Sequence, residues 1–383
     1  MSEPGLGSAD VAIIGGGLVG CATAYYLAAG GIDVALLERT ELNREASGTN
    51  AGSLHLQIYI HPTFGPDWID NILPSVALLR EAARSWASLE SLLGADLGIR
   101  LGGGLWVCDE AEHMALIKAK VRAENSMGVD SVVLSRHDLL EIAPYLASDM
   151  VGGSYLRGEG FADPLLVTPA FAHAAIAHGA RIVTQAPVQS IERRPGGGFV
   201  LETARGPFHA GRVVTAAGAW TPEVARMVGL ALPITGGVAH VSVTEARPPL
   251  MLDHLLQHIS RGLTIKQSPQ GTFIIGGGWP GRYDRATKRK VTLLDTIVGN
   301  VWVAAKTVPA LRDAQIVRTW GGVGSGTPNG MPIIGESERV RDFFVVYAPL
   351  GFTMGPIAAQ MFSQAFLTGG STVPLAPFSP NKY

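Results

Sequence analysis

The segment Val11-Ala12-Ile13-Ile14-Gly15-Gly16-Gly17-Leu18-Val19-Gly20 decides the fold of this 383-residue chain. Its first four residues predict a short buried strand, and the glycine-rich turn leads directly into an apolar helix that is expected to end near Ala29. Val34–Leu37 predicts the next buried strand. This strand–helix–strand order favours a parallel sheet with a right-handed crossover.

The spacing of Gly15, Gly17 and Gly20, with Glu38 at the end of the next strand, indicates a dinucleotide site. Gly15 permits the tight turn, Gly17 lets a pyrophosphate approach the backbone, and Gly20 lets helix and strand pack closely. Free amides at the helix N-terminus suit phosphate charge. Glu38 suits ribose hydroxyls and would repel a 2′-phosphate, so NADP is not expected.

Three further segments favour FAD over NAD. Arg39 and the small, polar run Ala46–Ser53 suit a loop that follows the pyrophosphate toward a flavin ring. Val213–Trp220 predicts a buried strand that ends in small residues. Pro349–Gly355 opens the last predicted helix, whose N-terminus would favour negative charge on the flavin.

Composition narrows the remaining possibilities. Hydrophobic residues make up 47% of the chain, charged residues 16%, and the net charge is −2, which argues against disorder and against nucleic acid as a partner. Two cysteines, Cys21 and Cys108, are too few for a disulfide framework. Neither a signal peptide nor an apolar run of roughly 20 residues is evident, so we expect a cytoplasmic protein.

The fold class that we expect is α/β, with a Rossmann-type, discontinuous FAD-binding domain and a substrate domain built on a mainly antiparallel sheet with flanking helices. Helical patterns lie near 71–93, 109–127, 163–178, 290–306 and 355–367, and a hairpin is expected across 188–203. The expected FAD-binding domain comprises 8–90, 148–228 and 316–372. The substrate domain comprises 91–147 and 229–315, and residues 373–383 read as a loose tail.

Together these motifs resemble the D-amino-acid-oxidase-like family of FAD amine oxidases and dehydrogenases, over nearly the whole chain. The resemblance also includes Thr327–Gly335. Ala46–Gln57 and Ile274–Trp279 are most similar to the flavin subunits of multi-component enzymes such as opine (octopine or nopaline) oxidase. Subunits of D-hydroxyproline dehydrogenase and hydrogen cyanide synthase are near alternatives.

The resemblance implies a glutathione-reductase-like FAD domain and oxidation of an amine next to a carboxylate to an imine, which water hydrolyses. It implies a larger partner subunit, with FMN or an iron–sulfur cluster in or beside that partner. The chain departs from the family at three points. Ser47–Gly52 offers no His or Cys for a covalent link, so we expect non-covalent FAD. Gly321–Gly326 lacks the arginine of glycine-oxidase-like members, and Thr353-Met354 replaces the lysine of sarcosine-oxidase-like members.

The residues expected to contact FAD come from these segments and from the start of the hairpin. They are Gly15, Gly17, Leu18, Val19, Glu38, Arg39, Ser47, Gly48, Asn50, Ala51, Gly52, Ser53, Leu54, Val188, Ala217, Gly218, Trp220, Gly351, Phe352, Thr353 and Met354.

Candidate substrate residues are fewer. His55 follows the flavin loop and is a candidate to face the ring or to accept the amine proton, although a structural histidine fits equally. Arg261 and Lys266 flank a predicted strand and are candidates to pair with the carboxylate. Trp320 and Tyr59 are candidates to wall a pocket. His254 and His258 have helical spacing, but no metal site is expected because a ligand set is incomplete.

Three alternatives stay open at this stage: an oxidase that passes electrons to O₂, a non-catalytic flavin-binding subunit, and an NAD-dependent dehydrogenase.

Overall fold

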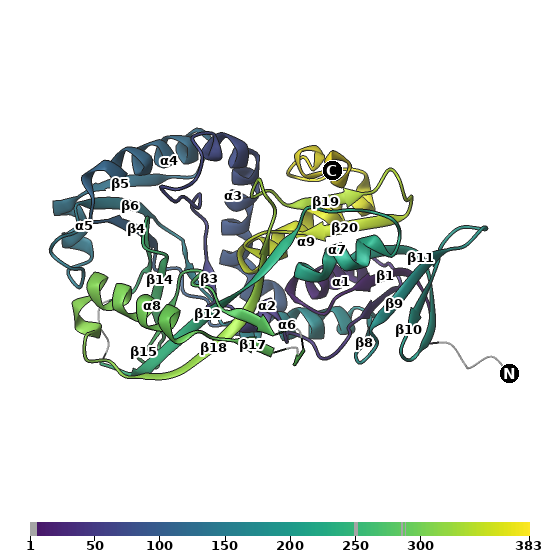
Figure 1. Ribbon diagram of the computed structural model, residues 1–383. Coiled ribbons are helices and arrows are strands. Elements are labelled where there is room, and N and C mark those ends of the chain that lie inside the picture. The colour runs from purple at the N-terminus through teal and green to yellow at the C-terminus, as the bar shows by residue number, and fades with distance from the viewer. Residues whose placement is uncertain (1–5, 249–251, 285, 288) are drawn as a thin grey trace.

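Two large sheets lie side by side along the long axis of the molecule (Figure 1). The structure is a computed structural model, and it describes residues 6–248, 252–284, 286–287 and 289–383. The first sheet contains β1 and lies beside the C-terminal end of the chain, whereas the second sheet occupies the other half of the molecule.

The first sheet has eight strands, and its central strands are parallel. The path runs β19-β20-β11-β1-β2-β8, with the β9–β10 hairpin attached to β11. The strands are β1 (Gly7–Ile14), β2 (Val34–Leu37), β8 (Arg181–Val183), β9 (Val188–Arg193), β10 (Phe199–Thr203), β11 (Gly206–Thr215), β19 (Ile333–Glu336) and β20 (Phe343–Tyr347). β1 pairs in parallel with β2 and β11, as the strand–helix–strand pattern predicts.

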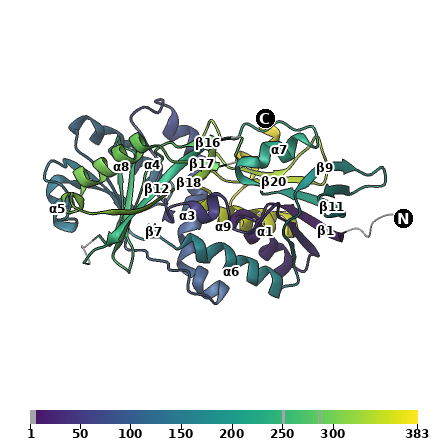
Figure 2. The same ribbon diagram turned by 60° about the horizontal axis from the view of Figure 1, so that its bottom comes forward.

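Both faces of the first sheet are covered, which explains why Val11–Ile14 is apolar at every position. Val11 and Ile13 face a core shared with the helices α1 (Leu18–Ala29), α3 (Trp68–Leu93), α6 (Pro164–Ala177) and α9 (Gly351–Thr368). Ala12 and Ile14 face a second core with the hairpin and α7 (Thr221–Arg226). Figure 2 shows α6 and α7 on opposite sides of this sheet.

The second sheet also has eight strands and is antiparallel except where β13 pairs with β4. Its order is β18-β12-β15-β14-β13-β4-β6-β5. The strands are β4 (Gly104–Cys108), β5 (Ser131–Ser135), β6 (Gly152–Leu156), β12 (Thr235–Ala246), β13 (Leu255–His258), β14 (Leu263–Gln267), β15 (Thr272–Gly276) and β18 (Ile316–Gly326).

Helices flank the second sheet. The apolar side chains Val303 and Ala304 of α8 (Leu294–Thr307) pack against one face of it. The helices α4 (Met114–Ser126) and α5 (Arg136–Ile142) also lie in this half. Two short ladders complete the fold: β3 (Ser53–Leu54) with β7 (Gly160–Phe161), and β16 (Arg282–Asp284) with β17 (Arg289–Val291). The expected α/β class is confirmed.

The structure corrects three details of the expected organisation. β6 lies within 148–228 and β18 opens 316–372, yet both pair into the second sheet, because long-range register rather than position along the chain assigns a strand. The terminal segment is not loose. It forms the short helices η4 (Ala376–Phe378) and η5 (Pro380–Lys382), and the Phe378 side chain is buried in the first core.

Candidate active site

A cavity of about 550 Å³ extends from the glycine-rich turn to the second sheet. Most residues expected to contact FAD line it: Gly15, Gly17, Leu18, Val19, Glu38, Arg39, Ser47, Asn50, Ala51, Ser53, Val188, Ala217, Gly218, Trp220, Gly351, Phe352 and Thr353. Four others, Gly48, Gly52, Leu54 and Met354, are not part of the lining. Leu54 and Met354 are buried in the first core and help to hold the lining segments in place.

The turn between β1 and α1 needs glycine at two positions. Gly15 has a φ of +118°, and a Cβ there would lie 2.6 Å from the carbonyl oxygen of Ala216. A Cβ on Gly20 would collide with the carbonyl of Gly15, so a side chain there would push α1 away from β1. These contacts are the close helix–strand packing that the dinucleotide motif requires.

Glu38 holds the turn from the end of β2. Its carboxylate accepts hydrogen bonds from the backbone amides of Gly16 (2.7 Å) and Thr40 (2.8 Å). Beside it, the guanidinium of Arg39 lies over the Trp220 ring, 3.9 Å from the centroid, and closes this end of the cavity. The Glu38 carboxylate therefore lies next to the glycine-rich turn between β1 and α1, where the ribose of a dinucleotide needs a hydrogen-bond acceptor.

The loop after β2 runs along the same cavity. It contains the short helix α2 (Ala46–Thr49), in which the Ser47 hydroxyl accepts a hydrogen bond from the Leu18 amide at the start of α1 (2.9 Å). The Asn50 side chain closes the next turn by accepting from the Gly52 amide (2.6 Å) and donating to the Ser47 carbonyl (2.7 Å). These bonds bring polar groups to the cavity wall between α1 and β3.

The N-terminus of α9 meets this loop. Gly351, Phe352 and Thr353 line the cavity at the first turn of an 18-residue helix, where the helix dipole favours negative charge. The Thr353 hydroxyl accepts the His55 amide (2.8 Å) and donates to the Ser53 carbonyl (3.3 Å). The first turn of α9 and the segment around His55 are therefore fixed relative to each other.

His55 lies where the two halves of the cavity meet. Its Nδ1 is 2.8 Å from Oε1 of Gln257 on β13, and the histidine lines the cavity. Burial lowers the pKa of His55 to about 4, an effect that Gln257 partly offsets and that the nearby Lys266 strengthens. The imidazole is therefore neutral near neutral pH, and one of its two ring nitrogens carries a lone pair.

Lys266 is buried behind the cavity wall. Its ammonium nitrogen donates to the hydroxyl of Ser53 (3.0 Å), and its side chain is 1% exposed. Burial lowers the pKa of Lys266 to about 7. Lys266 is not itself in the lining, but its hydrogen-bond partner Ser53 is, and so is Thr264 of the same strand β14.

Arg261 lies elsewhere. Its guanidinium binds the Asp109 carboxylate, which Lys306 also approaches at 3.4 Å, and Arg261 is absent from the cavity lining. The structure therefore brings Lys266, but not Arg261, to the site.

Sequence reasoning missed Trp106 and Gln257, which line the cavity together with the expected Tyr59. The rings of Tyr59 and Trp106 meet edge to face with centroids 5.5 Å apart. Both missed residues lie on short, fully buried strands, where their direction depends on the register between β4 and β13. Trp320 is outside the lining, and its indole donates to the Thr49 carbonyl (2.8 Å) and so supports α2.

His254 and His258 do not share a helix face, which corrects the helical interpretation of their spacing. His258 ends β13 beside Asp109 (3.4 Å), while His254 precedes that strand and is 3.1 Å from the Tyr145 hydroxyl. Leu255–His258 forms the strand β13, which is buried between β14 and β4. Across the described ranges, none of the helices has the length and apolarity to cross a bilayer.

The donor groups of the cavity fit FAD. The glycine turn and the start of α1 suit a pyrophosphate, Glu38 suits the ribose, and the first turn of α9 suits the electron-rich edge of a flavin. The same cavity continues beyond these groups to His55, Tyr59 and Trp106.

Comparison with known proteins agrees with this geometry. The family model described as "FAD dependent oxidoreductase" (DAO) matches residues 10–365. One of the opine oxidase subunits of Rhizobium meliloti is 28% identical over 98% of this chain and 97% of its own length. Dimethylglycine dehydrogenase of Rattus norvegicus is also 28% identical over 98% of this chain, but the match spans only 45% of that longer protein.

Among solved structures, glycine oxidase from Geobacillus kaustophilus superposes with a TM-score of 0.87 at 26% identity, covering 98% of this chain and 99% of that one. The chain therefore belongs to the DAO family of FAD-dependent oxidoreductases.

Proposed function

We propose that the protein oxidises the C–N bond of an N-substituted or D-configured amino acid, with an opine such as octopine or nopaline as the first candidate. A hydride, which is one proton with two electrons, leaves the carbon next to the carboxylate, and the amine loses a proton. The resulting imine is hydrolysed by water to an amine or amino acid and a 2-oxo acid. One observation carries the proposal: a single cavity joins the dinucleotide turn to His55 and the second sheet.

The cofactor end of this proposal uses the lining residues named above. The turn at Gly15–Leu18, the carboxylate of Glu38 and the amides of Gly351–Thr353 bind FAD non-covalently. FAD, when bound, supplies the acceptor for the two electrons and the hydrogen. Ser47–Ser53 contains no His or Cys for a covalent link, which supports the non-covalent assignment.

At the substrate end, His55 accepts the proton of the amine. Its imidazole is neutral because burial lowers its pKa to about 4, and a neutral amine is the form that gives up a hydrogen from the adjacent carbon. Tyr59 and Trp106 form an aromatic wall that orients the substrate and keeps water from that side of the cavity.

The substrate carboxylate is the group with the least obvious partner. Among the described lining residues the arginines are Arg39 and Arg44, which lie at the dinucleotide end. Lys266 is the candidate that the geometry supports, since its ammonium lies behind Ser53 and burial makes its charge responsive to a bound anion. Arg261 is the weaker candidate because its guanidinium already pairs with the Asp109 carboxylate.

A second candidate reaction concerns smaller substrates of the glycine, sarcosine or D-hydroxyproline type. The match to glycine oxidase over nearly the full length of both chains favours it. A flavin-binding subunit without catalysis is the rival from another class. It predicts that no amine reduces the bound flavin.

We also propose that the protein works as the flavin subunit of a hetero-oligomer in the cytoplasm. The word "subunit" in the name of the opine oxidase relative supports this. So does an apolar stripe on α8, where Leu294 (73% exposed), Val298 (55%) and Trp302 (59%) recur every four residues on the surface. An FMN or an iron–sulfur cluster in or beside the partner remains part of this proposal.

The experiment is an anaerobic absorbance titration of the purified protein, alone and with a co-purified partner. The compounds are octopine, nopaline, D-hydroxyproline, sarcosine, dimethylglycine and glycine. Loss of the oxidised-flavin band with an opine at low concentration supports the first candidate. Loss only with glycine or an N-methylated glycine selects the second, and loss with none of them favours the non-catalytic subunit.

A further inference from the structure

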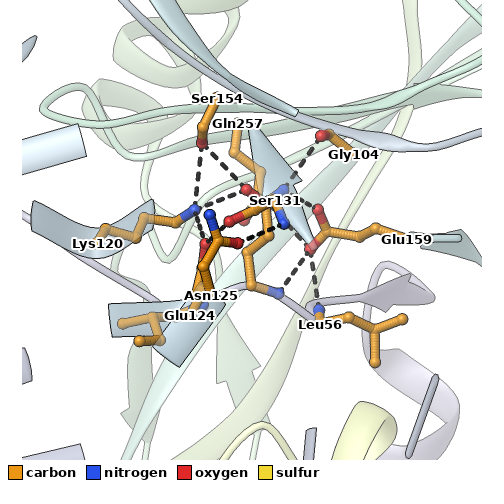
Figure 3. A network of polar contacts seen from close by, with 11 residues as sticks. Leu56, Gly104, Lys120, Glu124, Asn125, Ser131, Ser154, Glu159 and Gln257 are labelled. Carbon is orange, nitrogen blue, oxygen red and sulfur yellow. Dashed lines mark hydrogen bonds and ion pairs between the residues drawn. The ribbon is translucent and has the colours of Figure 1, made fainter. Parts of the chain in front are cut away.

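In the buried polar network behind His55, the donor and the acceptor of each hydrogen bond can be assigned one after another, beginning at Lys120 (Figure 3). The Lys120 ammonium is 0% exposed and can only donate hydrogen bonds. It donates to Oε1 of Gln57 (2.6 Å), to the Glu124 carboxylate (3.0 Å) and to the Ser154 hydroxyl (3.2 Å). Ser154 in turn donates to the same oxygen of Gln57 (3.0 Å). The Gln57 amide group must therefore direct its NH₂ to the other side.

On that other side lies Glu159, also 0% exposed. The Gln57 NH₂ group donates to one carboxylate oxygen of Glu159 and to the Gly104 carbonyl (3.1 Å). The second carboxylate oxygen accepts the backbone amides of Leu56 (2.9 Å) and Gln57 (3.4 Å). Each of these neighbours donates a hydrogen bond, so both oxygens of the Glu159 carboxyl group act as acceptors (Figure 3).

Gln257 completes the path to the cavity. Its NH₂ group faces the same Glu159 oxygen at 3.5 Å, where only a donor fits. Its carbonyl oxygen is consequently the atom that lies 2.8 Å from Nδ1 of His55. A carbonyl oxygen cannot donate, so Nδ1 must carry the proton. In the neutral ring Nε2 then holds a lone pair, and it forms no hydrogen bond with the described residues.

We propose that Gln257, anchored by Glu159, is a positioning residue that fixes the His55 proton on Nδ1 and leaves Nε2 as the acceptor in the cavity. The inference rests on the proposed function, because it assigns to Nε2 the amine proton. Burial, which lowers the pKa of His55 to about 4, keeps the ring neutral, and the network selects which of its two neutral forms is present. In the other form Nε2 would donate and could not receive a proton.

The first test reads the proton position directly, without turnover. The FAD-loaded protein is prepared with ¹⁵N in its histidine rings, and nitrogen–proton correlation spectra are recorded near neutral pH. His55→Asn identifies the His55 signals among the ten histidines of the chain. The expected result is a neutral ring protonated at Nδ1. A ring protonated at Nε2 would overturn the proposal.

The second test uses three variants. Gln257→Leu removes the acceptor, so the His55 signals should lose the Nδ1–H form. Gln257→Glu keeps an acceptor for Nδ1–H and, by sharing a proton with the Glu159 carboxylate, keeps a donor on that side, so it should retain the Nδ1–H form. Gln267→Leu is the matched control, since Gln267 is a buried glutamine on the neighbouring strand β14 whose side-chain amide donates to the Pro248 and Gly271 carbonyls. It should leave His55 unchanged, and equal spectra for all three variants would refute the role of Gln257.

Kinetics then separate this inference from the proposed function. With a substrate that reduces the wild-type flavin, the maximal rate of reduction should fall roughly 10- to 100-fold in Gln257→Leu, the usual range for losing an orienting partner. Gln257→Glu should recover most of that loss, and the flavin absorbance should not change. If no amine reduces the wild type, the proposed function fails while the spectra still decide the tautomer. If reduction is unaffected by Gln257→Leu, the positioning role is wrong although the function stands.

Discussion

Replacing Lys266 with Met should stabilise the FAD-free protein at neutral and acidic pH. The lysine side chain is 1% exposed and its ammonium donates one hydrogen bond, to the Ser53 hydroxyl at 3.0 Å. Within the described part of the chain no carboxylate forms an ion pair with it, and burial alone lowers its pKa from 10.5 to about 7. Methionine has a similar length and no charge to desolvate, so it fits the same space.

The size of the stabilisation follows from the shift in the pKa of Lys266. A difference between 10.5 and about 7 is roughly 3.5 pKa units, which at about 1.4 kcal/mol per unit gives an upper bound of about 5 kcal/mol. Below pH 7 both the folded and the unfolded chain bind the proton, so the folded state carries the whole penalty. Between pH 7 and 10.5 only the unfolded chain binds it, and the free energy of unfolding therefore rises with pH across that window.

The assay is denaturant unfolding of the FAD-free wild type and Lys266→Met at a series of pH values from about 6 to about 10. The variant should be more stable by a few kcal/mol at the acidic end, and the difference should shrink toward the alkaline end. Lys120→Met is the control: Lys120 is equally buried but paired with Glu124 at 3.0 Å, so its loss should destabilise the fold. Parallel stability curves for wild type and Lys266→Met would refute the reasoning.

Three further substitutions test the site. Glu38→Gln should weaken FAD binding roughly 10- to 100-fold, because an amide cannot accept both backbone hydrogen bonds that the carboxylate accepts; titration of the FAD-free protein, followed by flavin fluorescence, measures this, and an unchanged affinity would count against the site. Gly20→Ala should yield protein purified largely without flavin, since its Cβ meets the Gly15 carbonyl; a normal flavin-to-protein absorbance ratio would contradict that. Arg261→Gln should lower the melting temperature, because the guanidinium pairs with the Asp109 carboxylate, and it should change the substrate dissociation constant by no more than about two-fold. A large rise in that dissociation constant would show that Arg261 binds the substrate.

The cofactor half of the site could be predicted because its determinants are local. Gly15 and Gly20 are required by contacts within one strand–turn–helix unit, and Glu38 follows at a fixed distance along the same unit. Such short-range geometry is specified by residue type and spacing alone. The same holds for the hairpin between β9 and β10, which appears at the expected position.

The substrate half depends on long-range register, which a single sequence does not display. Gln257 and Trp106 come together only because β13 and β4 pair in parallel, across about 150 residues of chain. Arg261 was a reasonable candidate by residue type, but its partner Asp109 is equally distant in the sequence. Glu159 gave no signal at all, because nothing near it in the sequence predicts a fully buried carboxylate.

The most direct test of the central claim is a single-turnover experiment. The FAD-loaded protein is mixed anaerobically with a limiting amount of an opine, and both the oxidised-flavin absorbance and the released 2-oxo acid are measured. One 2-oxo acid and one amino acid should appear for each flavin reduced. Flavin that stays oxidised with every amino-acid-like compound and every partner preparation, in protein that binds FAD tightly, would contradict C–N oxidation as the function of this cavity.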